Sequence, residues 1–170
     1  DFTNHEEDIY VGYRYFDTFE RTVAYPFGFG LSYTTFKFGQ PKVKLQNNMV
    51  NIEVTVTNTG SVKGKEVAQV YVQAPKGNIE KPAKELKAFA KTRELQPGES
   101  QTLKMQVAVR DLASFDEAHS QWIAEAGKYV FHIGNNVSNT NCAADIVLKE
   151  YTEQVSNVMA PQHELNLLRK

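Results

Sequence analysis

The sequence predicts an all-β protein, a sandwich of two antiparallel sheets with an irregular aromatic lead-in at the N-terminal end. Three observations support this prediction. Apolar and polar residues alternate in one short segment after another between about residues 36 and 151. Glycine, proline and asparagine turns separate these segments. Finally, no helical stretch of about a dozen residues lies between them, as parallel strands would require.

Composition limits the protein class. The chain has 170 residues, of which 41% are hydrophobic and 23% are charged, which fits one soluble domain with extensions. No apolar run of about 18 residues is present, so no membrane-spanning helix is predicted. The 19 basic and 20 acidic residues give a net charge of -1 and form no long block of one sign. Neither nucleic acid nor a membrane is therefore expected as a partner.

Residues 1–35, called the lead-in below, are unusually rich in aromatic side chains. Pro26, Gly28 and Gly30 favour turns and exclude a long regular element. We expect the segment from Tyr25 to Phe36 to pack along the sandwich, and the segment from Tyr10 to Phe19 to be anchored less firmly. The ten aromatic residues of the lead-in are Phe2, Tyr10, Tyr13, Tyr15, Phe16, Phe19, Tyr25, Phe27, Phe29 and Tyr33.

The first half of the sandwich shows clear strand patterns. Four β-branched residues alternate with polar ones over 50–57, and the turn at 58–60 ends this strand. The next strand, over 67–73, places Val67 and Tyr71 on the face opposite to its small apolar residues. A third strand is predicted over 86–95, where a turn containing proline and glycine follows.

The second half continues the alternation. Strands are predicted over 103–109, 121–123, 129–133 and 144–149, and one helical turn over 111–114. About seven short strands with little helix are typical of an immunoglobulin or fibronectin III-like sandwich. Residues 152–170 form a polar tail that either lies on the sandwich or frays.

Carboxylates are plentiful, but none is predicted to be catalytic. Residues 6–8 form an acidic cluster, which we interpret as a solvated surface. Asp17 follows Arg14 by three residues, and an ion pair between them accounts for both charged side chains without a catalytic role. Asp116 and Glu117 lie in a predicted loop, where turn formation accounts for them.

Other chemical motifs are incomplete. The histidines lack metal-ligand spacing, and the lone Cys142 lies in a strand-like run where a buried side chain is expected. Residues 28–32 match neither a nucleophile elbow nor a phosphate-binding loop. The glycosylation sequon at 136–138 is interpreted as a chance match. No catalytic, cofactor-binding or metal-binding residue is predicted. The histidines are His5, His119, His132 and His163.

Several separate motifs resemble the C-terminal part of glycoside hydrolase family 3, which includes β-glucosidases and β-xylosidases. The most specific is Tyr-Pro-Phe-Gly-Phe-Gly-Leu-Ser-Tyr-Thr-Thr-Phe at 25–36, together with Ile-Tyr-Val-Gly-Tyr-Arg-Tyr-Phe-Asp at 9–17. The match covers roughly residues 6–150 and departs at 135–136, where many relatives carry serines. Further matching segments follow in the expected order at 58–60, 64–72, 82–89, 95–100 and 127–134.

The resemblance implies that residues 1–35 bridge from the end of an upstream α/β domain into a fibronectin III-like sandwich at 36–151, followed by the tail at 152–170. In that family, the nucleophile and the acid/base residue lie upstream, in a barrel and the α/β domain. No position here matches either of them. The resemblance therefore implies a non-catalytic accessory or stabilising domain, whose parent hydrolyses O-glycosidic bonds of β-glucosides or β-xylosides by a retaining mechanism. Its implied partners are the upstream domains, its location is periplasmic or secreted, and no cofactor is implied.

A second interpretation is an autonomous carbohydrate-binding or adhesion module, because fold alone does not decide function. Sugar binding would require an exposed aromatic platform on the sandwich. Tyr71 and Trp122 are the candidates, although both are also suited to the core. The lack of an identifiable set of catalytic residues disfavours a third interpretation, a free-standing enzyme. The sugar, the linkage and the oligomeric state stay open, with self-association through the aromatic lead-in as one possibility.

Overall fold

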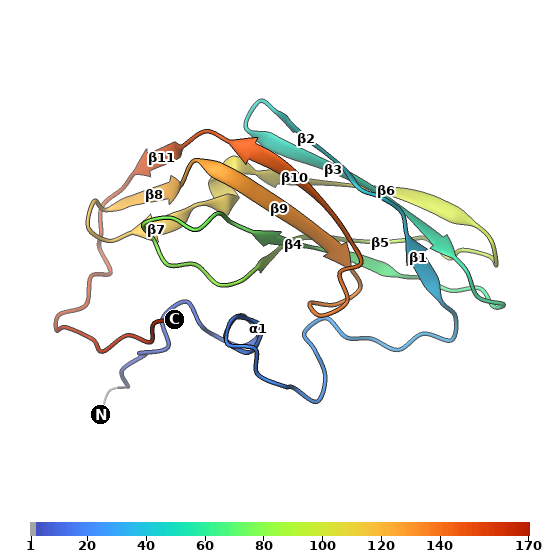
Figure 1. Cartoon of the computed structure of the whole chain (residues 1–170), viewed down its shortest axis with the longest axis horizontal. Coiled ribbons are helices and arrows are strands. Elements are labelled where there is room, and N and C mark those ends of the chain that lie inside the picture. The colour runs from blue at the N-terminus through green and yellow to red at the C-terminus, as the bar shows by residue number, and fades with distance from the viewer. Residues whose placement is uncertain (1–2) are drawn as a thin grey trace.

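Two antiparallel four-stranded sheets pack face to face and enclose the core (Figure 1). The structure is a computed structural model that describes residues 3–170, so Phe2 lies outside the described residues. One sheet contains β1 (Phe36–Phe38), β2 (Lys42–Gln46), β3 (Met49–Asn58) and β6 (Ser100–Ala108). The other contains β4 (Val67–Gln73), β5 (Glu85–Lys91), β9 (Gly127–Gly134) and β10 (Cys142–Leu148).

A smaller sheet lies at one end of the sandwich (Figure 1). It contains β7 (Ser114–Asp116), β8 (Gln121–Ala124) and β11 (Tyr151–Gln154). The helical turn predicted at 111–114 is a 3-10 helix at Val109–Leu112. Helix accounts for 6% of the residues and strand for 42%, which confirms the predicted all-β class. The part of the chain that the structure describes contains no helix long and apolar enough to cross a membrane.

The longest strand pair shows how alternation produces the core. Val50, Ile52 and Val54 of β3 are buried, and in the register of the sheet they lie opposite Val107, Met105 and Leu103 of β6. The residues between them point to the other face. There, polar side chains pair across the strands, as in the Thr55–Thr102 (2.9 Å) and Thr57–Ser100 (2.8 Å) hydroxyl contacts.

Strand β4 departs from this one-sided pattern, because both of its faces are buried. Ala68, Val70 and Val72 belong to the core cluster between the sheets. Gln69 and Tyr71 project to the opposite face, where a sandwich sheet commonly meets water. Tyr71 is nevertheless completely buried and Gln69 is only 8% exposed. Another part of the chain must therefore cover the outer face of this sheet.

Four short strands and one helix were not predicted from the sequence. β1, β2, β7 and β11 are three to five residues long and mostly half-buried or exposed, so alternation hardly marks them. β11 begins at Tyr151, the last residue assigned to the sandwich, continues into the predicted polar tail and pairs with β8. Helix α1 (Tyr13–Thr18) has six residues in the lead-in, where no helix was expected. So short a helix depends on tertiary packing and leaves no periodic signal.

One buried side chain joins the end of the lead-in to the sandwich. Asn58, at the end of β3, is completely buried. Its Oδ1 accepts hydrogen bonds from the Thr34 hydroxyl (2.8 Å) and the Gly60 N–H (3.1 Å). Its Nδ2 donates to the carbonyl oxygens of Val62 (2.8 Å) and Leu95 (2.9 Å). All four hydrogen-bonding positions of the amide are thus used.

We predict that Asn58→Ala lowers the free energy of unfolding by at least about 2 kcal/mol, because buried polar groups lose their partners. Asn51→Ala on the same strand is the matched control. Asn51 is half-buried and accepts one side-chain hydrogen bond, from Gln106 (2.7 Å), so its loss should cost no more than about 1 kcal/mol. Urea unfolding measures both. Equal losses would contradict the role assigned to Asn58.

Candidate functional site

The lead-in covers the outer face of β4 (Figure 1). The ring of Tyr13 meets Tyr71 edge-on, with 6.1 Å between the ring centroids. The Tyr71 hydroxyl lies 3.4 Å from the carbonyl oxygen of Phe27, and Gln69 Nε2 donates to the carbonyl oxygen of Gly28 (3.1 Å). Burial raises the pKa of Tyr71, so its hydroxyl stays protonated as a donor. The lead-in is therefore a third layer on the sandwich.

Helix α1 and its flanks are firmly attached. Tyr10 is 2% exposed and packs edge-on against Phe19, with centroids 5.0 Å apart. Its hydroxyl donates to Glu80 (2.5 Å) in the loop before β5. The backbone N–H of Ala83 donates to the Thr18 hydroxyl oxygen (2.8 Å). Side chains of the lead-in thus complete the backbone hydrogen bonding of the neighbouring loop.

Two ion pairs add to this attachment and correct one prediction. Arg14 and Asp17 were expected to pair with each other along the chain. Instead, Arg14 contacts Glu85 (2.9 Å) and Asp17 lies 3.6 Å from Lys84. Both partners lie at the start of β5, so each charge links the helix to the sandwich.

Both halves of the lead-in are anchored, so the expectation holds for Tyr25 to Phe36 and is corrected for Tyr10 to Phe19. The stretch from Tyr10 to Phe19 was expected to be the looser one, yet its side chains are docked on the sandwich. Between Tyr25 and Tyr33, the backbone is held, for example by the Val137 N–H bond to the Phe27 carbonyl (2.9 Å). The Phe27 ring stacks on Tyr13 with centroids 4.3 Å apart and is 45% exposed, while Tyr25, Leu31 and Tyr33 face solvent. Tyr33 is fully exposed. Within the helix, the ring of Tyr13 packs edge-on against Tyr71, one of the two residues considered for an exposed platform.

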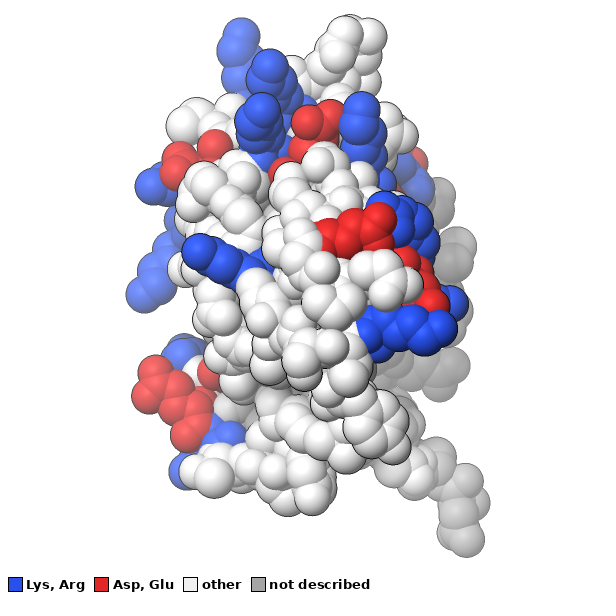
Figure 2. All heavy atoms as spheres, turned by 90° about the vertical axis from the view of Figure 1, so that its right-hand side faces the viewer, with Lys and Arg blue, Asp and Glu red and all other residues white. Residues whose placement is uncertain are grey.

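The exposed side chains form what we call the aromatic surface, defined as Tyr25, Phe27, Phe29, Leu31 and Tyr33. They are between 45% and 101% exposed. Tyr25 and Phe29 contact each other, with centroids 5.2 Å apart. The segment that carries them runs along the lower edge of the molecule toward β1 (Figure 1). Figure 2, which views the molecule from the right-hand side of Figure 1, shows a broad area without charged side chains. Large apolar side chains exposed together in this way typically mark an interaction site.

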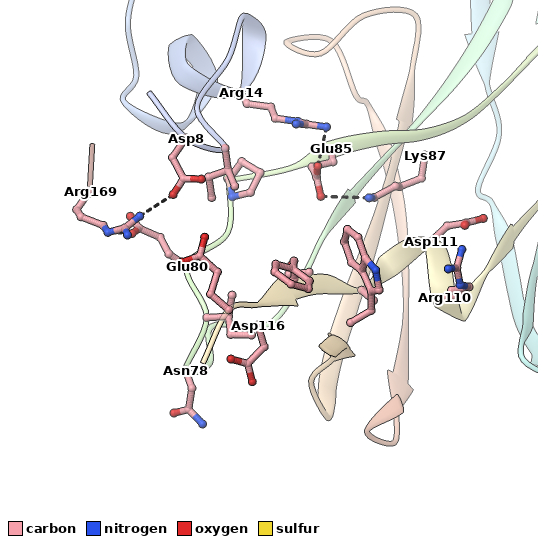
Figure 3. Close-up of a pocket in the computed structure, with 18 residues that line it drawn as sticks. Asp8, Arg14, Asn78, Glu80, Glu85, Lys87, Arg110, Asp111, Asp116 and Arg169 are labelled. Atoms are coloured by element: carbon pink, nitrogen blue, oxygen red, sulfur yellow. Dashed lines mark hydrogen bonds and ion pairs between the residues drawn. The ribbon is translucent and has the colours of Figure 1, made fainter. Parts of the chain in front are cut away.

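A pocket of about 850 Å³ lies between the lead-in, the loop before β5 and the small sheet (Figure 3). We call it the Trp122 pocket. Trp122 is 38% exposed there, so its predicted place in the core is only partly realised. Other lining residues that matter here are Arg14, Glu80, Glu85, Lys87, Arg110, Asp111, Phe115, Asp116 and Arg169.

Charged groups of opposite sign are paired around this pocket (Figure 3). Glu85 lies between Arg14 (2.9 Å) and Lys87 (3.2 Å). On the opposite side, Arg169 from the C-terminal end contacts Asp8 of the lead-in at 2.7 Å. The last residues of the polar tail therefore lie against the lead-in and the loop before β5.

Two carboxyl groups that line the pocket have lowered pKa values. Burial raises the pKa of Glu80, but hydrogen bonds from Tyr10 and from the Lys170 N–H outweigh it and lower the pKa. The hydrogen bond from His119 lowers the pKa of Asp116. A general acid in glycoside hydrolysis needs a raised pKa. Within residues 3–170, every carboxyl group with a resolved shift has its pKa lowered, which gives no support to acid catalysis.

The remaining candidate residues from the sequence have structural roles. Cys142 is buried, its thiol contacts the Ile133 carbonyl (3.4 Å), and burial raises its pKa, which confirms the expected inert side chain. Asn136 of the sequon is 8% exposed, and its Oδ1 accepts the Asn139 N–H (2.8 Å) within a turn. Among the described residues, no three histidine, cysteine, aspartate or glutamate side chains gather as metal ligands.

Comparison with known proteins decides the family. The fibronectin type III-like domain family matches residues 66–137. β-Glucosidase A of Butyrivibrio fibrisolvens is 41% identical over 95% of this chain, and β-glucosidase 3B of Thermotoga neapolitana is 46% identical with a TM-score of 0.85 over 89%. A solved GH3 β-glucosidase of Bifidobacterium adolescentis is 39% identical with a TM-score of 0.80 over 85%. The chain is part of a glycoside hydrolase family 3 protein.

The family 3 relatives are much longer than this chain. The chain covers 22% of the Butyrivibrio enzyme and 21% of each of the two solved β-glucosidases. It thus spans about a fifth of the relatives it matches, and further domains are implied. The resemblance drawn from the motifs at 9–17 and 25–36 is confirmed.

Sequence reasoning missed a buried ion pair that shapes one wall of the Trp122 pocket. Lys81 and Glu125 contact each other with side chains only 8% and 11% exposed. Glu125 also accepts the Asn78 N–H (2.7 Å), and Lys81 donates to the Ile79 carbonyl (3.0 Å). Burial raises the pKa of Glu125, but Lys81 and the Asn78 N–H outweigh it, so the pKa is lowered. The two residues lie 44 apart in sequence, and no local pattern joins them.

We predict that Lys81→Met lowers the free energy of unfolding at pH 7 by about 3 kcal/mol, because it leaves a buried carboxylate without its cation. The folded-state pKa of Glu125 lies below the ordinary value of 4.5. The stabilisation is therefore complete above about pH 4.5 and is lost as the pH falls through the folded-state pKa. The deficit of the variant should shrink between pH 7 and pH 3.

Lys128→Met serves as the control for this measurement. Lys128 is 62% exposed and lies 3.6 Å from Asp145, so its loss should cost less than about 1 kcal/mol. Urea unfolding at both pH values measures the two variants. A Lys81→Met deficit that is the same at pH 7 and pH 3 would show that the Glu125 charge is not what Lys81 stabilises.

Proposed function

We propose that this chain is a non-catalytic accessory domain of a β-glucosidase-like enzyme and stabilises the catalytic part of its parent protein. The observation that carries the proposal is that nearly the whole chain matches about a fifth of each of several enzymes named β-glucosidases. The parent would hydrolyse β-glucosides or β-xylosides by the retaining mechanism implied by the family. Its periplasmic or secreted location stays a prediction.

The chemistry of the Trp122 pocket supports the absence of catalysis. Retaining hydrolysis requires a nucleophilic carboxylate and a second carboxyl group that gives up a proton to the leaving group. Glu80 accepts hydrogen bonds from Tyr10 and Lys170, and Glu85 lies between two cations. The hydrogen bonds lower the pKa of Glu80, so this group is not suited to donate a proton, and both Glu85 oxygens are engaged by cations.

The aromatic surface supports the stabilising role. Its occupant is the remainder of the parent chain, the upstream barrel and α/β domains expected from the family, because about four-fifths of the relatives' length lies outside this chain. Burying a large apolar side chain contributes about 1.5–3 kcal/mol, so Leu31 and Tyr33 alone offer a substantial gain on docking. A permanent interface between domains is expected to be apolar in this way.

We predict that the purified 170-residue chain does not hydrolyse aryl β-glucosides or aryl β-xylosides. Turnover is measured against a blank purified in the same way. Activity that copurifies with the chain and disappears in an Asp17→Asn or Glu85→Gln variant would contradict the proposal, since both carboxylates are here assigned to ion pairs with the sandwich.

We also predict that the double substitution Leu31→Ser and Tyr33→Ser destabilises the complete parent protein by about 3 kcal/mol, because the docked surface loses its apolar contacts. The isolated chain should keep its stability, since both side chains are more than 90% exposed there. Val147→Ser, at a 73% exposed position of β10, is the control in both proteins. Thermal unfolding provides the measurement.

Two outcomes would contradict the docking proposal. One is an unchanged melting temperature of the parent protein after the double substitution. The other is a dimer of the isolated chain in sedimentation experiments that the double substitution abolishes, because the aromatic surface would then bind a second copy.

A further inference from the structure

We propose that the Trp122 pocket is a non-catalytic binding site for an uncharged oligosaccharide. This site is separate from the aromatic surface, because none of the five residues that define that surface lines the pocket. The inference concerns ligand binding by this chain itself. It does not depend on docking to the rest of the parent.

The pocket contains a fixed aromatic platform. Trp122 of β8 and Phe115 of β7 lie directly opposite each other in the strand register, and their ring centroids are 5.4 Å apart. Both residues line the pocket, and Trp122 is 38% exposed. Because two paired strands hold these rings, little conformational freedom is lost when a ligand packs on them. The apolar C–H face of a sugar ring suits such a surface, and an indole N–H can donate a hydrogen bond to a sugar hydroxyl.

Polar groups around the platform are held in place by other protein contacts. Glu85 is positioned by Arg14 and Lys87 at 2.9 and 3.2 Å. Asp116 is positioned by His119 (2.7 Å) and by Gln121 (3.1 Å). Carboxylates accept hydrogen bonds and guanidinium groups donate them, so together they can bind hydroxyls, which do both. Prearranged acceptors and donors beside an aromatic surface match the mixed polar and apolar surface of a sugar.

The charges favour a neutral ligand. Six acidic and four basic side chains line the pocket, so an anionic ligand is disfavoured. Asp8, Glu80 and Glu85 are already paired with Arg14, Lys87 or Arg169, which lowers the attraction for a cation. The volume of about 850 Å³ falls within the usual range for small-molecule sites, about 300–1,000 Å³.

Trp122 is the only tryptophan of the chain, so its fluorescence reports on this pocket directly. We expect a saturable change in emission, and protection from acrylamide quenching, when cellotetraose or maltotetraose is added to the 170-residue protein. Weak sites for small ligands have dissociation constants near 1 mM, so the titration should extend to about 10 mM. This measurement needs no variant and therefore does not depend on how a substitution folds.

Isothermal titration calorimetry on variants then places the sugar in the pocket. Trp122→Ala should weaken binding at least tenfold. Tyr33→Ala is the matched control, because it removes a fully exposed aromatic side chain outside the pocket and should leave affinity unchanged. Circular dichroism verifies that each variant is folded.

Three outcomes would overturn the proposal. They are no saturable change with either sugar, unchanged affinity in folded Trp122→Ala, and an equal loss in Tyr33→Ala. None of these bears on whether the parent is destabilised by changes at Leu31 and Tyr33, so failure here can be told apart from failure of the accessory role.

Discussion

The outer face of β4 is the constraint on which the rest of the structure depends. A tyrosine and a glutamine on that face, Tyr71 and Gln69, are shielded from water and need hydrogen-bond partners there. Gln69 Oε1 accepts the Tyr71 hydroxyl at 2.6 Å, while Gln69 Nε2 donates to the carbonyl oxygens of Gly28 (3.1 Å) and Asn135 (2.7 Å). The lead-in thus supplies both apolar cover and hydrogen bonds that the two sheets lack.

This cover also organises the surfaces to which we assign function. Docking of α1 brings Tyr10 to Glu80, and the same carboxylate accepts the Lys170 N–H (2.7 Å), so the lead-in and the C-terminal residue meet beside the Trp122 pocket. Further along, the backbone at Phe27 and Gly28 is bound to the sandwich while the side chains of Tyr25, Leu31 and Tyr33 face outward. The lead-in therefore forms part of the wall of the Trp122 pocket and also carries the aromatic surface.

Much of the sandwich could be predicted from sequence because alternation reports burial on one face. That rule worked for Val50 to Val56 and for the strand at 67–73, but it could not show that both faces of β4 are covered. The edge strands β1 and β2 are too short and too exposed to show a pattern. The Arg14–Glu85 and Lys81–Glu125 pairs join residues 71 and 44 positions apart, which local spacing cannot reveal. The exposure of Trp122 likewise depends on where the lead-in docks on the sandwich, which a local pattern does not show.

Hydrogen exchange at Ala83 and Leu86 tests most directly whether the lead-in belongs to the folded domain. Their N–H groups donate to the hydroxyl oxygens of Thr18 and Tyr13, each at 2.8 Å, so their protection depends on the docked helix. The account predicts that both amides are strongly protected in the isolated chain, to the same extent in dilute and in concentrated solution. Exchange at the rate of an open chain in dilute solution, or protection that appears only at high concentration, would contradict it.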